Sequence, residues 1–177
     1  MSVVPQLPST APPSTAQPAV AEQLVVAAAV LHQGRVLVQQ RAHPPLTAGR
    51  WELPGGRVEP NESARDALVR ECREELAVEI VPGEQLGPDV PLPGGYLLRV
   101  HLARLADPAA RPVPIEHAAL RWVDATELAS LDWLDADRTL LPHLAPLLPN
   151  PRTAMSIHIA VRGGGEAGGG GRFGVGG

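Results

Sequence analysis

The stretch PGGRVEPNESARDALVRECREEL, residues 54–76, decides the fold, because a glycine turn leads there into a helical pattern that carries crowded glutamates. Projection of the helix at roughly 100° per residue places the apolar side chains on one broad arc. Glu71 and Glu75 fall inside that arc and Glu74 falls at its edge, whereas the neighbouring arginines fall on the opposite side. Glutamates on a hydrated face would share the arginines' side, so the pattern predicts carboxylates that face the interior.

Carboxylates on a core-facing stripe are costly unless they pair with a cation or bind a metal. Residues three and four apart are neighbours on a helix, so the carboxylates of Glu71, Glu74 and Glu75 are expected to converge. Converging hard oxygen ligands suit Mg²⁺ or Mn²⁺, which keep several waters and accept substrate phosphates. The turn at Gly55 and Gly56 brings bare backbone close to the start of the helix. The alternative is a solvated charge run supported by the arginines of the helix.

The composition favours one domain with a real core, because the chain has 177 residues of which 44% are hydrophobic. A net charge of -4 argues against binding to nucleic acid through backbone charge alone. The single cysteine excludes an internal disulfide and fits a reducing compartment. The start lacks a signal-peptide pattern and no apolar run is long enough to cross a bilayer. We therefore expect a cytoplasmic protein that does not bind membranes.

Two low-complexity segments flank the predicted domain. Residues 1–22 are rich in Pro, Ser, Thr and Ala, which predicts disorder. Residues 149–177 are dominated by glycine, which predicts a flexible tail. Residues 23–148 are then the folded domain.

Apolar runs bounded by turn signals predict the elements of this domain. Strands are expected at 24–31, 35–41, 78–81, 96–105 and 120–123. Helices are expected at 63–76, at 124–131 and from Ala136, and Ser63 is the expected N-cap of the first, with Asp66 closing a variant of the capping box. Strands mixed with two or three helices, without strict alternation, predict an α+β sandwich.

The segment from residue 56 to residue 78 resembles the Nudix box: Gly, five residues, Glu, seven residues, Arg-Glu, an apolar residue, any residue, Glu-Glu, any residue, Gly and an apolar residue. The charged positions of the box are matched at the correct spacing, namely by Glu62, Arg70, Glu71, Glu74 and Glu75. Two positions depart from it. Ala77 replaces the last glycine, and Cys72 fills a position usually held by an aliphatic residue.

This resemblance implies the Nudix fold, an α/β/α sandwich with a mixed β-sheet, and cleavage of a nucleoside diphosphate linked to another group. It implies that Glu71, Glu74 and Glu75 bind the divalent cations, with the Gly55 carbonyl as a further ligand. It also implies that Arg70 orients a box glutamate through a salt bridge. In such chemistry the metal neutralises the pyrophosphate, holds it in line and activates a water.

Outside the box, VLVQQRA, GRWELPGG and residues 116–144 resemble the MutT-type subfamily, and within it the 8-oxo-dGTP diphosphatase and CTP pyrophosphohydrolase branches. This resemblance predicts a Mg²⁺-dependent enzyme that hydrolyses oxidised or pyrimidine nucleoside triphosphates to monophosphate and pyrophosphate, as a monomer or homodimer. One alternative is a Nudix hydrolase of a dinucleoside polyphosphate or nucleotide sugar. Another is a nucleotide-binding module without activity, although such modules tend to lose box carboxylates and this sequence keeps them.

Three residues outside the box are candidates for substrate binding. Arg41 ends the second strand, where this subfamily places an arginine near the phosphates; its alternative is a surface arginine. Asp137 matches the position that reads the base in MutT-like proteins, and its carboxylate suits an exocyclic amine such as cytosine N4; its alternative is a residue that opens the third helix. Trp133, like Trp51, has an aromatic face that suits stacking on a base; the alternative is a core tryptophan.

The general base is left open by the sequence. Glu116 lies in a loop that can reach the site in this fold, and the box glutamates are the other candidates. His117 adjoins it, although a lone loop histidine is usually structural or solvated.

Overall fold

The computed structural model describes residues 23–149. The predictions for residues 1–22, and for the tail beyond residue 149, lie outside the described residues. Within the described part, no helix combines the length and the apolar character that crossing a membrane requires.

A mixed β-sheet of eight strands forms the centre of the described chain. The strands are β1 (Gln23–His32), β2 (Arg35–Gln40), β3 (Trp51–Glu52), β4 (Gly55–Arg57), β5 (Ile80–Gln85), β6 (Val90–Leu92), β7 (Tyr96–Leu105) and β8 (Ala119–Val123). The main path runs β3-β2-β1-β7-β5, while β4 pairs with β1, β6 with β7 and β8 with β2. β1 and β7 are parallel and the other named strands pair antiparallel, which confirms the mixed sheet.

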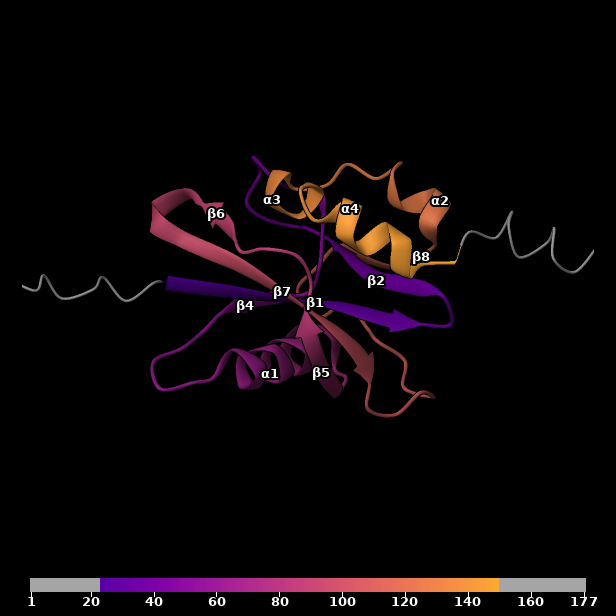
Figure 1. Cartoon of the computed structure of the whole chain (residues 1–177), viewed down its shortest axis with the longest axis horizontal. Coiled ribbons are helices and arrows are strands. Elements are labelled where there is room, and N and C mark those ends of the chain that lie inside the picture. Colours follow the sequence, from indigo (N-terminus) through magenta and orange to yellow (C-terminus); the bar gives the residue numbers. More distant parts are fainter. Residues whose placement is uncertain (1–22, 150–177) are drawn as a thin grey trace, which may run out of the picture.

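Helices cover both faces of the sheet, which makes the predicted α/β/α sandwich (Figure 1). The helix α1 (Ala64–Leu76) lies on one face, and α2 (Ala125–Leu128), α3 (Asp135–Arg138) and α4 (Leu141–Leu144) lie on the other, with short 3₁₀ turns η1 (Pro93–Gly95) and η2 (Ala145–Leu147). β1 is buried between these layers. Its Val26 and Val30 pack in the cluster that contains the α1 residue Leu68, while Ala27 packs in the cluster that contains Leu140. A strand covered on both faces explains the continuous apolar run in the sequence.

Both ends of α1 follow from the local sequence. Ser63 is the N-cap, as predicted: its hydroxyl accepts from the Asp66 N–H and donates to the Asp66 carboxylate at 2.6 Å. At the other end, Ala77 adopts the left-handed conformation with φ 55° and its N–H donates to the carbonyls of Arg73 and Cys72. Ala77 stands where the Nudix box has glycine, so the chain keeps the turn but places a Cβ in a conformation that glycine adopts without strain.

Two predicted elements have different bounds in the structure, and the strand β6 was not predicted. The helix expected at 124–131 ends at Leu128, because the chain beyond it turns back to β3: the Trp51 N–H donates to the Asp132 carbonyl and the Leu134 N–H donates to the Trp51 carbonyl. The strand expected at 78–81 runs instead from Ile80 to Gln85. β6 was not expected, because its VPL sequence contains a proline, which strands accept at sheet edges.

Candidate active site

Glu75 is the buried carboxylate of the box. It is 8% exposed, and its Oε2 accepts hydrogen bonds from the Gln39 amide and from the Gly55 N–H, both at 3.0 Å. Burial raises the pKa of Glu75 to about 7, against the opposing effects of the Gln39 hydrogen bond, of His117 and of the Gly55 N–H. A carboxyl group that is hard to ionise in the protein alone has a strong drive to accept a cation.

Glu71 and Glu74 share one arginine. Arg70 Nη1 lies 2.8 Å from Glu71 Oε1 and 3.1 Å from Glu74 Oε2, and Arg70 also pairs with Glu62 at 2.9 Å. The Arg70 side chain is therefore half-buried, not on the open solvent face that the helical projection indicated. Burial raises the pKa of Glu71, opposed by its pairing with Arg70. Arg70 contacts three box glutamates and so ties Glu71 and Glu74 of the helix to Glu62 in the loop before it.

Gly56 allows the close approach of the turn to Glu71. A Cβ at Gly56 would lie 2.3 Å from the Glu71 carboxyl carbon, so no other residue fits without displacing that side chain. Gly55, the expected source of a carbonyl ligand, approaches the backbone of Val26 and Ala27 in β1 just as closely. The two glycines thus bring the turn against the sheet and the carboxylates at once.

The three helix carboxylates do not converge on one point, contrary to the expectation from their spacing. Glu74 is exposed and turned to Arg70, while Glu75 faces Gln39 and the β4 turn. Within residues 23–149 no three His, Cys, Asp or Glu side chains already form a metal-holding group. The spacing argument failed because it left out Arg70, which neutralises two of the three.

A hollow of about 510 Å³, called here the acidic hollow, lies beside these groups. Its lining combines acidic side chains and bare backbone with Arg41 and histidines, namely Arg41, Ala42, His43, Glu52, Gly55, Gly56, Glu71, Glu75, Glu116 and His117. Carboxylate and backbone oxygens are the hard ligands that Mg²⁺ and Mn²⁺ take. Burial raises the pKa of both Glu71 and Glu75 here, a cost that a bound cation relieves. The residues therefore fit a divalent metal.

Sequence reasoning assigned no role to Glu52, and it considered His117 only as a neighbour of the candidate base Glu116. Glu52 Oε2 pairs with Arg41 Nη1 at 2.7 Å, and Glu52 Oε1 lies 2.9 Å from His117 Nε2. A signal for Glu52 exists in retrospect: it lies between the buried Trp51 and Leu53, so strand alternation points it away from their core. Glu116, the candidate base, lines the same hollow and is exposed.

Asp137 lies in a second hollow of about 340 Å³, called here the apolar slot. It is 5% exposed, and its Oδ1 accepts a hydrogen bond from the Leu53 N–H at 3.0 Å. Burial raises the pKa of Asp137 to about 7, opposed by that hydrogen bond. The other walls are mostly apolar, among them Val25, Ala27, Leu53, Leu92, Leu98, Leu134 and Ala136.

The acidic hollow and the apolar slot adjoin. Four residues line both of them, namely Arg41, Glu52, Gly55 and Gly56. One elongated ligand can therefore place a charged end among the carboxylates and a flat apolar end beside Asp137. Arg41 stands at the junction, near the place where the resemblance puts a phosphate-binding arginine.

Trp133 is a core residue, which corrects its assignment to the substrate. It is 1% exposed, and its indole N–H donates to the Leu128 carbonyl at 2.7 Å. The pairing of its backbone segment with β3 turns the ring inward, into the same core cluster as Trp51, which is 8% exposed. Neither ring faces the slot as a stacking platform.

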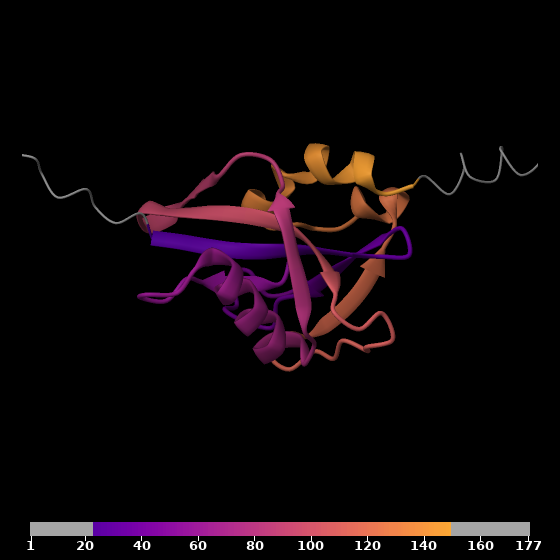
Figure 2. The same ribbon diagram turned by 60° about the horizontal axis from the view of Figure 1, so that its bottom comes forward.

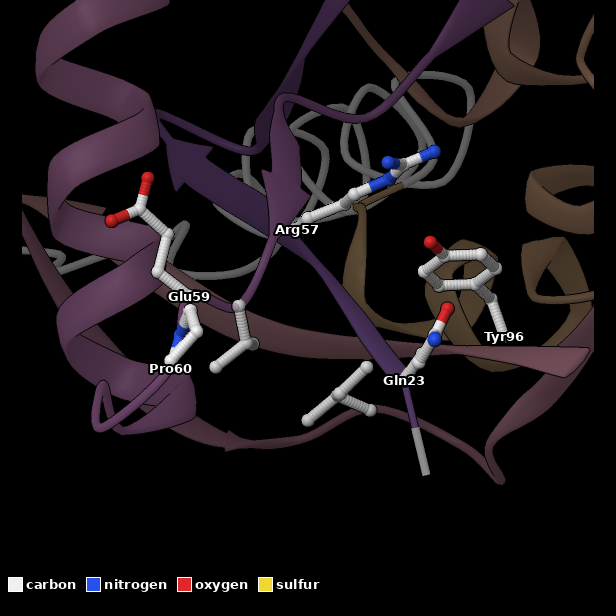
Figure 3. Close-up of a pocket in the computed structure, with 7 residues that line it drawn as sticks. Gln23, Arg57, Glu59, Pro60 and Tyr96 are labelled. Carbon is white, nitrogen blue, oxygen red and sulfur yellow. The ribbon is translucent and has the colours of Figure 1, made fainter. Parts of the chain in front are cut away.

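Figure 3 shows a separate hollow of about 550 Å³ beside the first residues of β1. Gln23, Arg57 and Tyr96 line it, and the Arg57 guanidinium lies 4.7 Å from the centre of the Tyr96 ring. None of the glutamates of α1 lines this hollow, so it lies apart from the acidic hollow.

Comparison with known proteins agrees with this arrangement. The profile of the NUDIX domain matches residues 22–144. The chain is 45% identical over 141 residues to "Putative 8-oxo-dGTP diphosphatase 2" of Mycobacterium tuberculosis, covering 77% of this chain and 96% of that protein. It is 38% identical over 117 residues to CTP pyrophosphohydrolase of Escherichia coli, covering 66% of this chain and 87% of that protein. The solution structure of the E. coli ORF135 protein matches with a TM-score of 0.62 at 36% identity, covering 71% of this chain and 90% of that one. With the box, the sandwich and these relatives in agreement, the chain belongs to the Nudix family of hydrolases.

Proposed function

We propose that this Nudix hydrolase is a Mg²⁺-dependent nucleoside triphosphate pyrophosphohydrolase, which cleaves an oxidised or pyrimidine nucleotide to nucleoside monophosphate and pyrophosphate. The observation that carries the proposal is the junction of the acidic hollow with the apolar slot across Arg41, Glu52, Gly55 and Gly56. A nucleoside triphosphate has a chain of charged phosphates at one end and a flat base at the other. The two hollows offer matching surroundings in that order.

Glu71, Glu75 and the Gly55 carbonyl, from residues that line the acidic hollow, are proposed metal ligands, together with Glu74, which is exposed and does not line the hollow. When bound, the divalent cation supplies charge neutralisation of the pyrophosphate and an activated water. Arg70 holds Glu71 and Glu74 by salt bridges at 2.8 and 3.1 Å, which ties the exposed Glu74 to the same guanidinium as Glu71, a residue that lines the hollow. Mn²⁺ is the proposed alternative metal, because the same oxygen ligands accept it.

Two further residues complete the phosphate end. Arg41, whose side chain is 31% exposed, is the proposed phosphate-binding arginine, because it faces both hollows while Glu52 fixes its direction. Glu116 is the proposed general base, because it lines the hollow and is exposed, so it can take a proton from a water there.

In the apolar slot, Asp137 is the proposed base-reading residue. The Leu53 N–H holds one of its oxygens in place, and apolar walls exclude competing water. An ionised carboxylate accepts a hydrogen bond from an exocyclic amine, whereas a protonated one donates to a carbonyl. The raised pKa of Asp137, about 7, makes both forms accessible near neutral pH, which fits relatives named for CTP and for 8-oxo-dGTP.

The proposed setting is the cytoplasm, where the enzyme acts on free nucleotides and not on nucleic acid or membranes, as a monomer or homodimer. The net charge of -4 argues against binding to nucleic acid through its charged backbone. The biological role would be to sanitise the nucleotide pool.

The test is a substrate panel with the purified full chain and Mg²⁺. CTP, dCTP, 8-oxo-dGTP, a dinucleoside polyphosphate and a nucleotide sugar are incubated separately, and products are identified by ³¹P NMR. We expect pyrophosphate and monophosphate from at least one of the triphosphates. Cleavage of the dinucleoside polyphosphate or the nucleotide sugar, with all triphosphates left intact, would overturn the proposal.

A further inference from the structure

His117 is fixed beside the catalytic carboxylates by the backbone on both of its sides. It lies in the loop of residues 106–118, which follows β7 and passes along the end of α1 (Figure 2). The Ile115 N–H donates to the Glu75 carbonyl at 3.0 Å, and the Ala118 N–H donates to the Gln40 carbonyl at 2.9 Å. The His117 imidazole is consequently held beside these carboxylates, and the His117 side chain is 10% exposed.

Glu52 determines which nitrogen of His117 carries the proton. Its Oε1 lies 2.9 Å from Nε2, while its Oε2 pairs with Arg41 at 2.7 Å. A carboxylate paired with an arginine accepts hydrogen bonds, so the proton of the neutral ring sits on Nε2 and Nδ1 presents a lone pair.

That lone pair has no hydrogen-bond partner in the described chain. Nδ1 is buried, and it lies 3.8 Å from Glu75 Oε1, the oxygen opposite to the one that Gln39 and Gly55 hold. A buried acceptor costs about 1–3 kcal/mol when it is left without a partner. An acceptor that faces a carboxylate oxygen is compensated when a cation lies between them.

We infer that His117 Nδ1 is a nitrogen ligand of a divalent cation that it shares with Glu75, and that this nitrogen favours Mn²⁺ and other transition-metal cations over Mg²⁺. Ligands at about 2.0–2.2 Å from one ion are separated by up to about 4 Å, which accommodates the 3.8 Å between these atoms. A histidine ligand commonly donates its other ring N–H to a carboxylate, as His117 does to Glu52. Because residues 23–149 hold no ready group of three such side chains, water and phosphate oxygens supply the remaining ligands.

Imidazole nitrogen discriminates among the metals that this family uses. Carboxylate and carbonyl oxygens suit Mg²⁺ and Mn²⁺ alike, whereas imidazole binds transition metals and adds little for Mg²⁺. His117 is thus a metal-selectivity residue. The inference rests on the metal-dependent site of the proposed function, but it concerns metal binding alone and is measured without substrate.

The test is pulsed EPR of Mn²⁺ bound to the full chain without nucleotide. We expect nitrogen coupling from a directly bound imidazole in the wild type, and its loss in His117→Gln. His101→Gln is the matched control, because His101 is also a buried histidine with an unpartnered ring nitrogen, but lies on β7 and does not line the acidic hollow. His43→Gln tests the other imidazole of that hollow. Both controls should keep the coupling.

Affinities give the second readout. His117→Gln should weaken Mn²⁺ binding about tenfold or more, with a change of less than about threefold for Mg²⁺ measured by competition. A wild-type spectrum without nitrogen coupling would overturn the inference and needs no variant to fold. Coupling that persists in His117→Gln, or equal losses for the two metals, would also overturn it. The proposed function fails separately, if no triphosphate is cleaved.

Discussion

The acidic hollow and the apolar slot share four lining residues but hold their buried acids in opposite ways. In the hollow, Glu75 has Gln39, Gly55 and His117 around it, and Arg70 supports its neighbours, so charge can be matched there. In the slot, Asp137 has apolar walls and one hydrogen bond from the Leu53 backbone. Burial raises both pKa values to about 7. The same rise in pKa therefore supports two different proposed roles: cation binding by Glu75 in the hollow, and a choice between accepting and donating a hydrogen bond by Asp137 in the slot.

The largest effect is expected from a substitution that removes a charge from the acidic hollow and leaves the apolar slot unchanged. Glu75→Gln keeps the shape and the hydrogen bonds from Gln39 and Gly55 but removes the charge that a cation needs. We expect turnover with Mg²⁺ to fall about a thousandfold, because metal charge stabilisation is worth several kcal/mol. Steady-state pyrophosphate release measures it. Glu79→Gln, an exposed glutamate just beyond α1 paired with Arg73, is the control and should keep full activity. Full activity in Glu75→Gln would remove that residue from the proposed ligands.

A second prediction concerns stability and tests the contribution of Asp137 in the apolar slot alone. Because the pKa of Asp137 is raised in the folded protein, that protein keeps a proton which the unfolded chain loses from about pH 4 upwards. The free energy of unfolding should therefore fall as pH rises from about 4 to about 7, by on the order of 3 kcal/mol from this group. Asp137→Asn should make the profile less steep, as measured by urea unfolding in EDTA, and the part of the slope that comes from Glu75 should remain. Added Mg²⁺ should reduce the part of this pH dependence that comes from Glu75, but not the part that comes from Asp137. An unchanged profile in Asp137→Asn would show that the pKa of Asp137 is not raised by burial in the folded protein.

A third, smaller effect tests whether the slot selects the base. Asp137→Asn retains an acceptor for the Leu53 N–H but replaces a titrating group with an amide. We expect the ratio of kcat/KM for CTP to that for 8-oxo-dGTP to shift about tenfold, with unchanged products. An unchanged ratio would place base selection elsewhere in the slot.

The smallest effect is expected from a substitution outside both regions, which should change stability without changing activity. Ala77→Gly restores the box glycine at a position with φ 55°. Removal of the Cβ from the left-handed conformation should raise the free energy of unfolding by about 1 kcal/mol, seen as a higher urea midpoint. Activity should be unchanged, because Ala77 lines neither hollow. A lower midpoint would show that the alanine methyl makes stabilising contacts.

The box, the N-cap of α1 and the burial of β1 were predictable because each is a local pattern. Glu62, Arg70 and the three helix glutamates follow a fixed spacing, and Ser63 with Asp66 follows a capping rule. The buried Asp137 was predictable only through the resemblance, since nothing in WLDAD itself places it in a slot. These roles for the site residues remain predictions until the variants are measured.

Other features depend on contacts that no local pattern describes. His117 meets Glu52 across 65 residues, and Arg70 holds charges that the helical projection treated separately. Trp133 was expected at the substrate because rings suit bases, but pairing of its segment with β3 draws it into the core. In each case tertiary contacts outweighed the local signal.

The loop of residues 106–118 and the end of α1 share hydrogen bonds, and this has a dynamic consequence. The Val113 and Ile115 N–H groups donate to the Leu76 and Glu75 carbonyls, both at 3.0 Å, so the loop closes off the last turn of the helix. The loop that carries Glu116 and His117 therefore opens together with that turn, as one cooperative unit. Amide hydrogen exchange at Val113 and Ile115 should therefore report a single shared opening free energy.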